Sequence, residues 1–151
     1  MLSGGEPMFQ QDFIEILSYL YERYEGKIIL STNSLLINND NIAELVKMCD
    51  SFEISVDGID ESTCALVRGK GVFNKVCQKI NLLKESGAKN INLSMVFSDK
   101  NEHLMNAFRE LNVALGTTPI CRIFSAIGRG ANNRFIFTEK TEDDIYFQKN
   151  T

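Results

Sequence analysis

The stretch SFEISVDG, residues 51–58, alternates apolar and polar side chains and then ends in an aspartate and a glycine. Phe52, Ile54 and Val56 occupy every second position, which is the period of a β-strand with one buried face. Three other short apolar runs have the length of buried strands: KIILST (27–32), INLSMVF (91–97) and ICRIFS (120–125). Leu2 and Ser3 are interpreted as the end of a further strand, so five strands are predicted.

The segments between these strands repeat apolar residues at steps of three and four, the spacing of one helix face. This pattern predicts helices over about 10–24, 42–49, 72–86 and, after a cap at Ser98 or Asp99, to about 115. Gly116 is placed to end the last of them. A polar loop is expected between Gly58 and Val72.

Strands that alternate with helices predict an α/β fold with a parallel sheet and right-handed crossovers. Such sheets bind ligands at the carboxyl ends of their strands, whether the sheet is open or curved into a barrel. The 151 residues suffice for one core.

The net charge is -4, and the basic residues form no block, which argues against nucleic acid or an anionic membrane as a partner. No apolar run reaches the roughly 20 residues of a membrane helix, and no secretion signal begins the chain. A cytoplasmic protein is expected. The four cysteines, at 49, 64, 77 and 121, lack the close spacing of a metal-binding loop.

Short polar groups follow the predicted strands at the same end of the sheet. Two glycines permit close approach of a ligand, Pro7 fixes the exit from their loop, and Glu6 can accept hydrogen bonds from an ammonium group. The groups are Gly4-Gly5-Glu6-Pro7, residues 31–34 (STNS), residues 55–58 (SVDG) and Gly128-Arg129-Gly130.

Each group taken singly has an ordinary structural interpretation as a turn or a cap. Their repetition after three consecutive strands favours a binding site. His103 is interpreted as structural or solvated. Asp143 and Asp144 lie in a polar tail without the apolar surroundings that separate the pKa values of an acid and a base.

With GGEP followed by STNS, SVDG and the pair Arg68-Gly69, the sequence resembles the radical S-adenosylmethionine (radical SAM) enzymes. The nearest likeness is to the SPASM group, which carries a cysteine-rich C-terminal extension and includes peptide-modifying enzymes. The resemblance covers Leu2 to about Asn133. It implies a partial (β/α)6, TIM-like barrel over residues 1–133, contributing the second to the sixth strand, and a polar tail or linker over residues 134–151.

The resemblance also implies the cofactors. Such enzymes bind S-adenosylmethionine beside a [4Fe-4S] cluster, cleave it to a 5'-deoxyadenosyl radical and abstract hydrogen from a substrate. By this likeness Gly4, Gly5 and Glu6, with Pro7 after them, would hold the methionine ammonium. Ser55 and Asp57 would lie near the ribose or carboxylate, Arg68 would bind the carboxylate, and Thr32 and Asn33 would face the same pocket. The family more often has glycine where this chain has Ser34.

The family's CxxxCxxC loop, which lies before GGEP and holds the cluster, has no counterpart in the sequence. The chain is therefore interpreted as a fragment that is inactive alone, whose parent is a radical SAM oxidoreductase or peptide-modifying enzyme with a peptide or protein as substrate. Its exposed barrel edge would invite self-association. Two alternatives are a cluster-free binding or scaffold protein derived from the barrel, and a phosphate-binding α/β domain that uses Gly128–Gly130.

Overall fold

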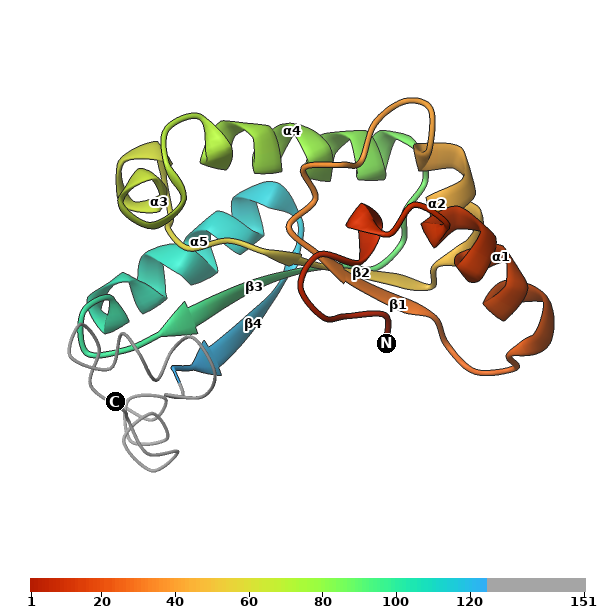
Figure 1. Ribbon diagram of the computed structural model, residues 1–151. Coiled ribbons are helices and arrows are strands. Elements are labelled where there is room, and N and C mark those ends of the chain that lie inside the picture. The colour runs from red at the N-terminus through yellow and green to blue at the C-terminus, as the bar shows by residue number, and fades with distance from the viewer. Residues whose placement is uncertain (125–151) are drawn as a thin grey trace.

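The computed structural model describes residues 1–124 (Figure 1). Four parallel strands form one sheet in the order β1-β2-β3-β4, so strands that are consecutive in sequence are also neighbours in space. The strands are β1 (Ile29–Thr32), β2 (Ser51–Ser55), β3 (Ile91–Phe97) and β4 (Thr118–Ile123). The helices are α1 (Phe13–Arg23), α2 (Ile42–Met48), α3 (Glu61–Arg68), α4 (Val72–Glu85) and α5 (Met105–Leu115), with short 3-10 turns η1 (Pro7–Phe9) and η2 (Glu102–Leu104).

The α-helices lie along one side of the sheet, as Figure 1 shows. This one-sided cover follows from the strand order, because right-handed crossovers between strands in sequential order all pass over the same face. A doubly wound sheet reverses its strand order and carries helices on both faces. The described part of the chain therefore has the form of a barrel wall, with α/β alternation as predicted from sequence.

The core lies between the sheet and its helices. The register aligns Leu30 with Phe52 and Ile91, and Thr32 with Ile54 and Leu93, so each row points toward the helices. Fully burying a side chain of this size contributes about 1.5–3 kcal/mol. The intervening rows are polar: Ser31, Glu53, Asn92 and Thr118 align in one row, and Ser55 aligns with Ser94 in the next.

The prediction of a fifth strand is wrong, because Leu2 makes only an isolated parallel bridge to Leu30. The Leu2 N–H donates to the Ile29 carbonyl over 2.7 Å, and the Leu2 carbonyl accepts from the Ser31 N–H over 2.9 Å. Strand pairing ends there, since the next residues turn away into the glycine loop. The segment does lie beside β1, where the sequence placed it.

The prediction of a polar loop between Gly58 and Val72 is also wrong, because residues 61–68 form the helix α3. A helix there was missed because only Cys64 of its eight residues is buried, so no repeat of buried apolar residues marks it. The other predicted elements are present with shifted ends. β4 begins two residues before Ile120, and η2 precedes α5. Among residues 1–124, no helix combines the length and the apolar character needed to cross a bilayer.

Candidate functional site

A cavity of about 440 Å³ opens on the polar face of the sheet at the carboxyl ends of β1 and β2. Small-molecule sites in proteins commonly have volumes of about 300–1,000 Å³. Seven of the nine predicted binding residues line it: Gly4, Gly5, Thr32, Asn33, Ser55, Asp57 and Arg68. Glu6 and Pro7 do not. A larger hollow of about 530 Å³ lies between α1 and α2 and includes none of the strand-end residues.

The Gly4-Gly5 loop presents bare backbone to the cavity. Gly4 has a φ of 139°, a conformation that side chains rarely adopt. A Cβ atom added at Gly4 or Gly5 would meet no atom within 4 Å, so the space beside both residues is open. Pro7 then begins η1 and turns the chain toward α1. The sequence prediction of a loop that admits close approach of a ligand therefore fits this geometry.

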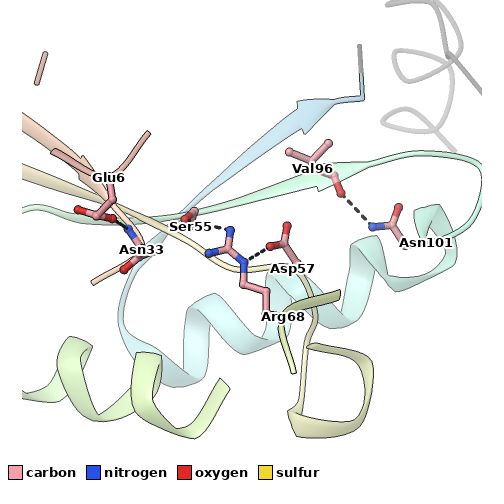
Figure 2. Close-up of polar contacts among 7 residues, drawn as sticks. All are labelled: Glu6, Asn33, Ser55, Asp57, Arg68, Val96 and Asn101. Carbon is pink, nitrogen blue, oxygen red and sulfur yellow. Dashed lines mark hydrogen bonds and ion pairs between the residues drawn. The ribbon is translucent and has the colours of Figure 1, made fainter. Parts of the chain in front are cut away.

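Glu6 binds the protein itself (Figure 2). One carboxylate oxygen accepts from the Thr32 hydroxyl over 2.6 Å and from the Met8 N–H over 3.3 Å, and the other accepts from the Asn33 N–H over 2.7 Å. These bonds join the glycine loop to the end of β1. Charge-assisted bonds contribute about 1.5–3 kcal/mol each, so the tie is strong. The role predicted for Glu6, contact with a ligand ammonium, stays a prediction, but the carboxylate's geometry serves first to fix the loop.

Ser34 follows this tie in a left-handed conformation, with a φ of 65°. The position at which the radical SAM family more often has glycine is thus one where glycine is the least strained residue. The Ser34 hydroxyl is fully buried and has no hydrogen-bond partner among residues 1–124. Both features give a physical reason for glycine at this position.

We expect Ser34→Gly to raise the free energy of unfolding by about 1 kcal/mol. The change removes about 1–2 kcal/mol of backbone strain and an unpaired buried hydroxyl, against about 0.4–1 kcal/mol for the greater freedom of glycine in the unfolded chain. Urea denaturation measures the difference. Ser34→Ala is the matched control, because it removes the hydroxyl and keeps the strain. A glycine variant no more stable than the alanine variant would show that the conformation costs little.

Arg68 reaches the cavity from the last residue of α3. Figure 2 shows its guanidinium between Ser55 and Asp57: Nε donates to an Asp57 carboxylate oxygen, and Nη2 lies 3.4 Å from the Ser55 hydroxyl oxygen. The structure therefore brings together three residues that the sequence placed in one pocket. The ion pair is partly exposed, with 29% of the Arg68 and 22% of the Asp57 side chain accessible.

Hydrogen bonds fix the start of α3 and join it to the segment that follows the helix. Asp60 and Thr63 form a capping box at its start, and these bonds, first that from the Thr63 N–H, hold the pKa of Asp60 below its ordinary value. Glu61 accepts from the N–H groups of Gly71 and Asn74, which fastens the following loop. Although α3 buries little, its position is fixed and Arg68 is presented from a defined helix end.

Sequence reasoning missed a second polar cluster in the cavity, formed by Glu53, Ser94 and Arg122. Arg122 Nη2 lies 2.5 Å from a Glu53 carboxylate oxygen, and Nε donates to the Ser94 hydroxyl over 3.1 Å. Glu53 is 8% exposed, so its charge is nearly buried and is compensated by this pair. One available signal was the alternation in SFEISVDG, which puts Glu53 on the same face as Ser55 and Asp57.

The cysteines of the described chain do not fit a [4Fe-4S] cluster. Cys49 and Cys64 are buried in the core, and burial, with the charge of Asp50, raises the pKa of Cys49 to about 12. Burial also raises the pKa of Cys64 and of Cys77, whereas cluster ligands are thiolates. Within residues 1–124, no group of three or more Cys, His, Asp or Glu side chains could hold a metal ion.

Several sequence predictions fall on residues outside those that the structure describes. They are the Gly128-Arg129-Gly130 group, the Asp143-Asp144 pair and the proposed boundary between residues 133 and 134. His103 lies in η2, away from the residues that line the cavity.

A one-sided parallel α/β wall with a polar cavity at its strand ends is the architecture of part of an α/β barrel. Residues 1–111 match the family model of the Radical SAM superfamily, and the chain belongs to this superfamily. Members use S-adenosylmethionine and a [4Fe-4S] cluster. The family predicted from the sequence is thus confirmed.

Relatives of known name match most of the chain. Mycofactocin maturase MftC from Mycolicibacterium smegmatis is 29% identical over 132 residues, which are 87% of this chain and 33% of that protein. GTP 3',8-cyclase from Psychromonas ingrahamii is 28% identical over 116 residues, 76% of this chain and 32% of that protein. The chain therefore spans about a third of the length of the curated relatives it matches.

Solved structures share the fold. SuiB from Streptococcus suis, bound to S-adenosylmethionine, superimposes with a TM-score of 0.76 at 16% identity, over 97% of this chain and 34% of that chain. The enzyme anSMEcpe with bound AdoMet gives a TM-score of 0.64 at 22% identity, over 80% and 34%. With mycofactocin maturase, these are SPASM-type members, so the predicted likeness to that group is confirmed. The four strands match part of the radical SAM barrel.

Proposed function

We propose that this chain forms the S-adenosylmethionine-binding wall of a radical SAM enzyme that modifies a peptide or protein. The observation that carries the proposal is the cavity, in which seven of the nine residues predicted from family motifs meet at the strand ends. Its bare glycine backbone, its ion-paired arginine and its volume fit a small zwitterionic ligand.

The residues of this chain would divide the work of holding the cofactor. The backbone of Gly4 and Gly5 would face the methionine ammonium, and Glu6 would keep their loop against β1. Arg68 has donors beyond those bound to Ser55 and Asp57 and would bind the carboxylate. Ser55 and Asp57 would contact the ribose, and Thr32 and Asn33 would line the same wall. When bound, the cofactor would supply a 5'-deoxyadenosyl radical that abstracts hydrogen from the substrate.

The cluster is assigned to the whole enzyme, because the cysteines of residues 1–124 do not fit it. The same observation supports the alternative of a binding or scaffold protein without radical chemistry. Anaerobic reconstitution of the complete gene product distinguishes the two. If the protein is a radical SAM enzyme, the reconstituted sample should show the brown absorbance of a [4Fe-4S] cluster and release 5'-deoxyadenosine. A colourless protein that still binds S-adenosylmethionine would support the scaffold alternative.

We propose a peptide substrate because the relatives of this chain include proteins named mycofactocin maturase. GTP 3',8-cyclase matches at a similar identity, and its name points to a nucleotide. The charges of the cavity favour the first assignment: its described lining carries two acidic and two basic side chains, namely Glu53, Asp57, Arg68 and Arg122. A triphosphate would meet no excess of positively charged side chains there.

Gly5→Ala is expected to lower the affinity for S-adenosylmethionine at least about tenfold, a difference of about 1.4 kcal/mol, without lowering the melting temperature. The added methyl group meets no protein atom within 4 Å and would occupy the space left for the ligand. Isothermal titration and thermal unfolding of the same samples measure the two effects.

Gly116→Ala provides the matched control. Gly116 ends α5 with a φ of 63° and does not line the cavity, so alanine there should lower stability by about 1–2 kcal/mol and leave the affinity unchanged. Equal affinity in wild type and Gly5→Ala would contradict the assignment of the glycine loop to the cofactor.

A further inference from the structure

We propose that Arg122 is a substrate-binding residue that takes a carboxylate of the substrate on the polar face of the sheet. This inference rests on the proposed function and adds to it a recognition site and a substrate feature. Arg122 lies on β4 and Arg68 at the end of α3, yet both line the same cavity. The cavity therefore holds two guanidinium groups from different elements, and the cofactor's one carboxylate needs only one of them.

The Arg122 guanidinium is held in place, and within residues 1–124 it has more donors than partners. A guanidinium has five N–H donors. Among the described residues, one Arg122 donor binds Ser94 and another binds Glu53, and 47% of the Arg122 side chain remains exposed. Because its planar group is fixed by two partners, binding an anion would cost little further side-chain entropy.

A purely structural role for Arg122 accounts for only part of this arrangement. Glu53 is nearly buried and needs a cation, which Arg122 supplies. However, a cation that only neutralised Glu53 would not need a side chain half exposed to the cavity. A group that both satisfies Glu53 and faces the open space is suited to bind a ligand there.

The charge of the site selects the kind of anion. Glu53 offsets the charge of Arg122, and Asp57 offsets that of Arg68, so the charged side chains of the described lining balance. A single carboxylate can use the fork of the guanidinium with little repulsion, whereas a phosphate dianion would be repelled by Glu53. We therefore assign the ligand as a carboxylate carried by a peptide, such as a glutamate or aspartate side chain.

The test uses the 151-residue chain labelled with nitrogen-15 and two capped peptides, Ac-Ala-Ala-Glu-NH2 and its glutamine counterpart. The NMR signals of the Arg122 Nε–H and the Ser94 backbone amide report binding. We expect the glutamate peptide to shift both signals and to bind at least about tenfold more tightly than the glutamine peptide. Inorganic phosphate should bind more weakly than the glutamate peptide.

Three variants separate recognition from folding. Arg122→Gln should abolish the preference for glutamate. Arg122→Lys keeps a cation beside Glu53 but loses the planar fork, so it should lower the preference several-fold with an unchanged backbone spectrum. Arg109→Gln, on the outer side of α5 where Arg109 contacts Asn106, should behave as wild type.

S-adenosylmethionine titration of the same samples keeps this inference separate from the proposed function. If Arg122→Gln lowers the affinity for S-adenosylmethionine as much as Arg68→Gln does, Arg122 belongs to the cofactor site and the inference is wrong. Equal binding of the two peptides, or tighter binding of phosphate, would also overturn it. Failure of the wild type to bind S-adenosylmethionine contradicts the proposed function, while the peptide comparison still decides the role of Arg122.

Discussion

Gly58→Ala is expected to lower the free energy of unfolding by about 3 kcal/mol, at the upper end of the range for overpacking. A Cβ atom at Gly58 would lie 2.3 Å from the backbone nitrogen of Cys64 and 2.7 Å from the carbonyl carbon of Thr63. These are backbone atoms of α3, so no side-chain rotation can relieve the clash. The capping box of Asp60 and Thr63 fixes the same turn of the helix.

The same change should weaken the binding of S-adenosylmethionine. To admit the methyl group, α3 must move away from the end of β2, and Arg68 at its last residue moves with it. Arg68 then loses its alignment with Asp57 and Ser55. Urea denaturation measures the loss of stability, and titration with S-adenosylmethionine measures the loss of affinity.

Gly69→Ala is the matched control for this experiment. Gly69 follows Arg68 with a φ of 86°, but a Cβ atom there would meet no neighbour within 4 Å. Alanine should therefore cost only the strain of this glycine-type backbone conformation, about 1–3 kcal/mol. If Gly58→Ala is as stable as Gly69→Ala or more stable, the close approach of α3 does not explain the glycine in SVDG.

Helices and strands could be predicted from the sequence wherever one buried face makes apolar residues recur at a regular spacing. Phe52, Ile54 and Val56 alternate because one face of β2 packs against helices, and α4 shows its helix through Val76, Ile80 and Leu83. By contrast, α3 exposes Leu66 and Val67 and buries only Cys64, so its apolar residues do not repeat along a buried face. Its detectable signal was local, in the spacing of Asp60 and Thr63 as a cap.

Apart from its family resemblance, the sequence predicted only those residues of the candidate site that lie at the end of a strand, because parallel α/β sheets bind ligands at the carboxyl ends of their strands. That rule placed Thr32, Asn33, Ser55 and Asp57 at one rim without knowledge of any contact. The pair of Glu53 and Arg122 spans 69 residues, and it depends on how β2, β3 and β4 align. The sequence alone does not give the register of neighbouring strands, so this pair could not be predicted from it.

The role of Glu6 shows a different limit of the sequence. A motif identifies a carboxylate near a cofactor, but it does not say whether the oxygens face the ligand or the protein. Here the oxygens bind Thr32, Asn33 and Met8. The residue that sequence reasoning treated as a direct ligand thus has the geometry of a residue that positions the glycine loop.

Glu6→Ala is accordingly expected to lower both stability, by about 3 kcal/mol, and the affinity for S-adenosylmethionine, by more than tenfold. The substitution removes two short charge-assisted bonds and a longer one, and it leaves the partly buried Asn33 N–H without its acceptor. The glycine loop then separates from β1. Chemical denaturation and isothermal titration, carried out on the same protein, test whether the two losses occur together.

Variants of Thr32 test whether Glu6 affects the binding of S-adenosylmethionine by positioning the glycine loop or by contacting the cofactor directly. The Thr32 hydroxyl donates to Glu6 and accepts from the Ser34 N–H, so Thr32→Val removes one of the two short bonds of the tie while the carboxylate stays. Thr32→Ser keeps the hydroxyl and should restore both stability and affinity. If Glu6 acts as a positioning residue, Thr32→Val will reproduce part of the loss of both stability and affinity seen in Glu6→Ala. If Glu6→Ala loses affinity at unchanged stability and Thr32→Val binds as wild type does, the carboxylate contacts the cofactor directly and the positioning role is wrong.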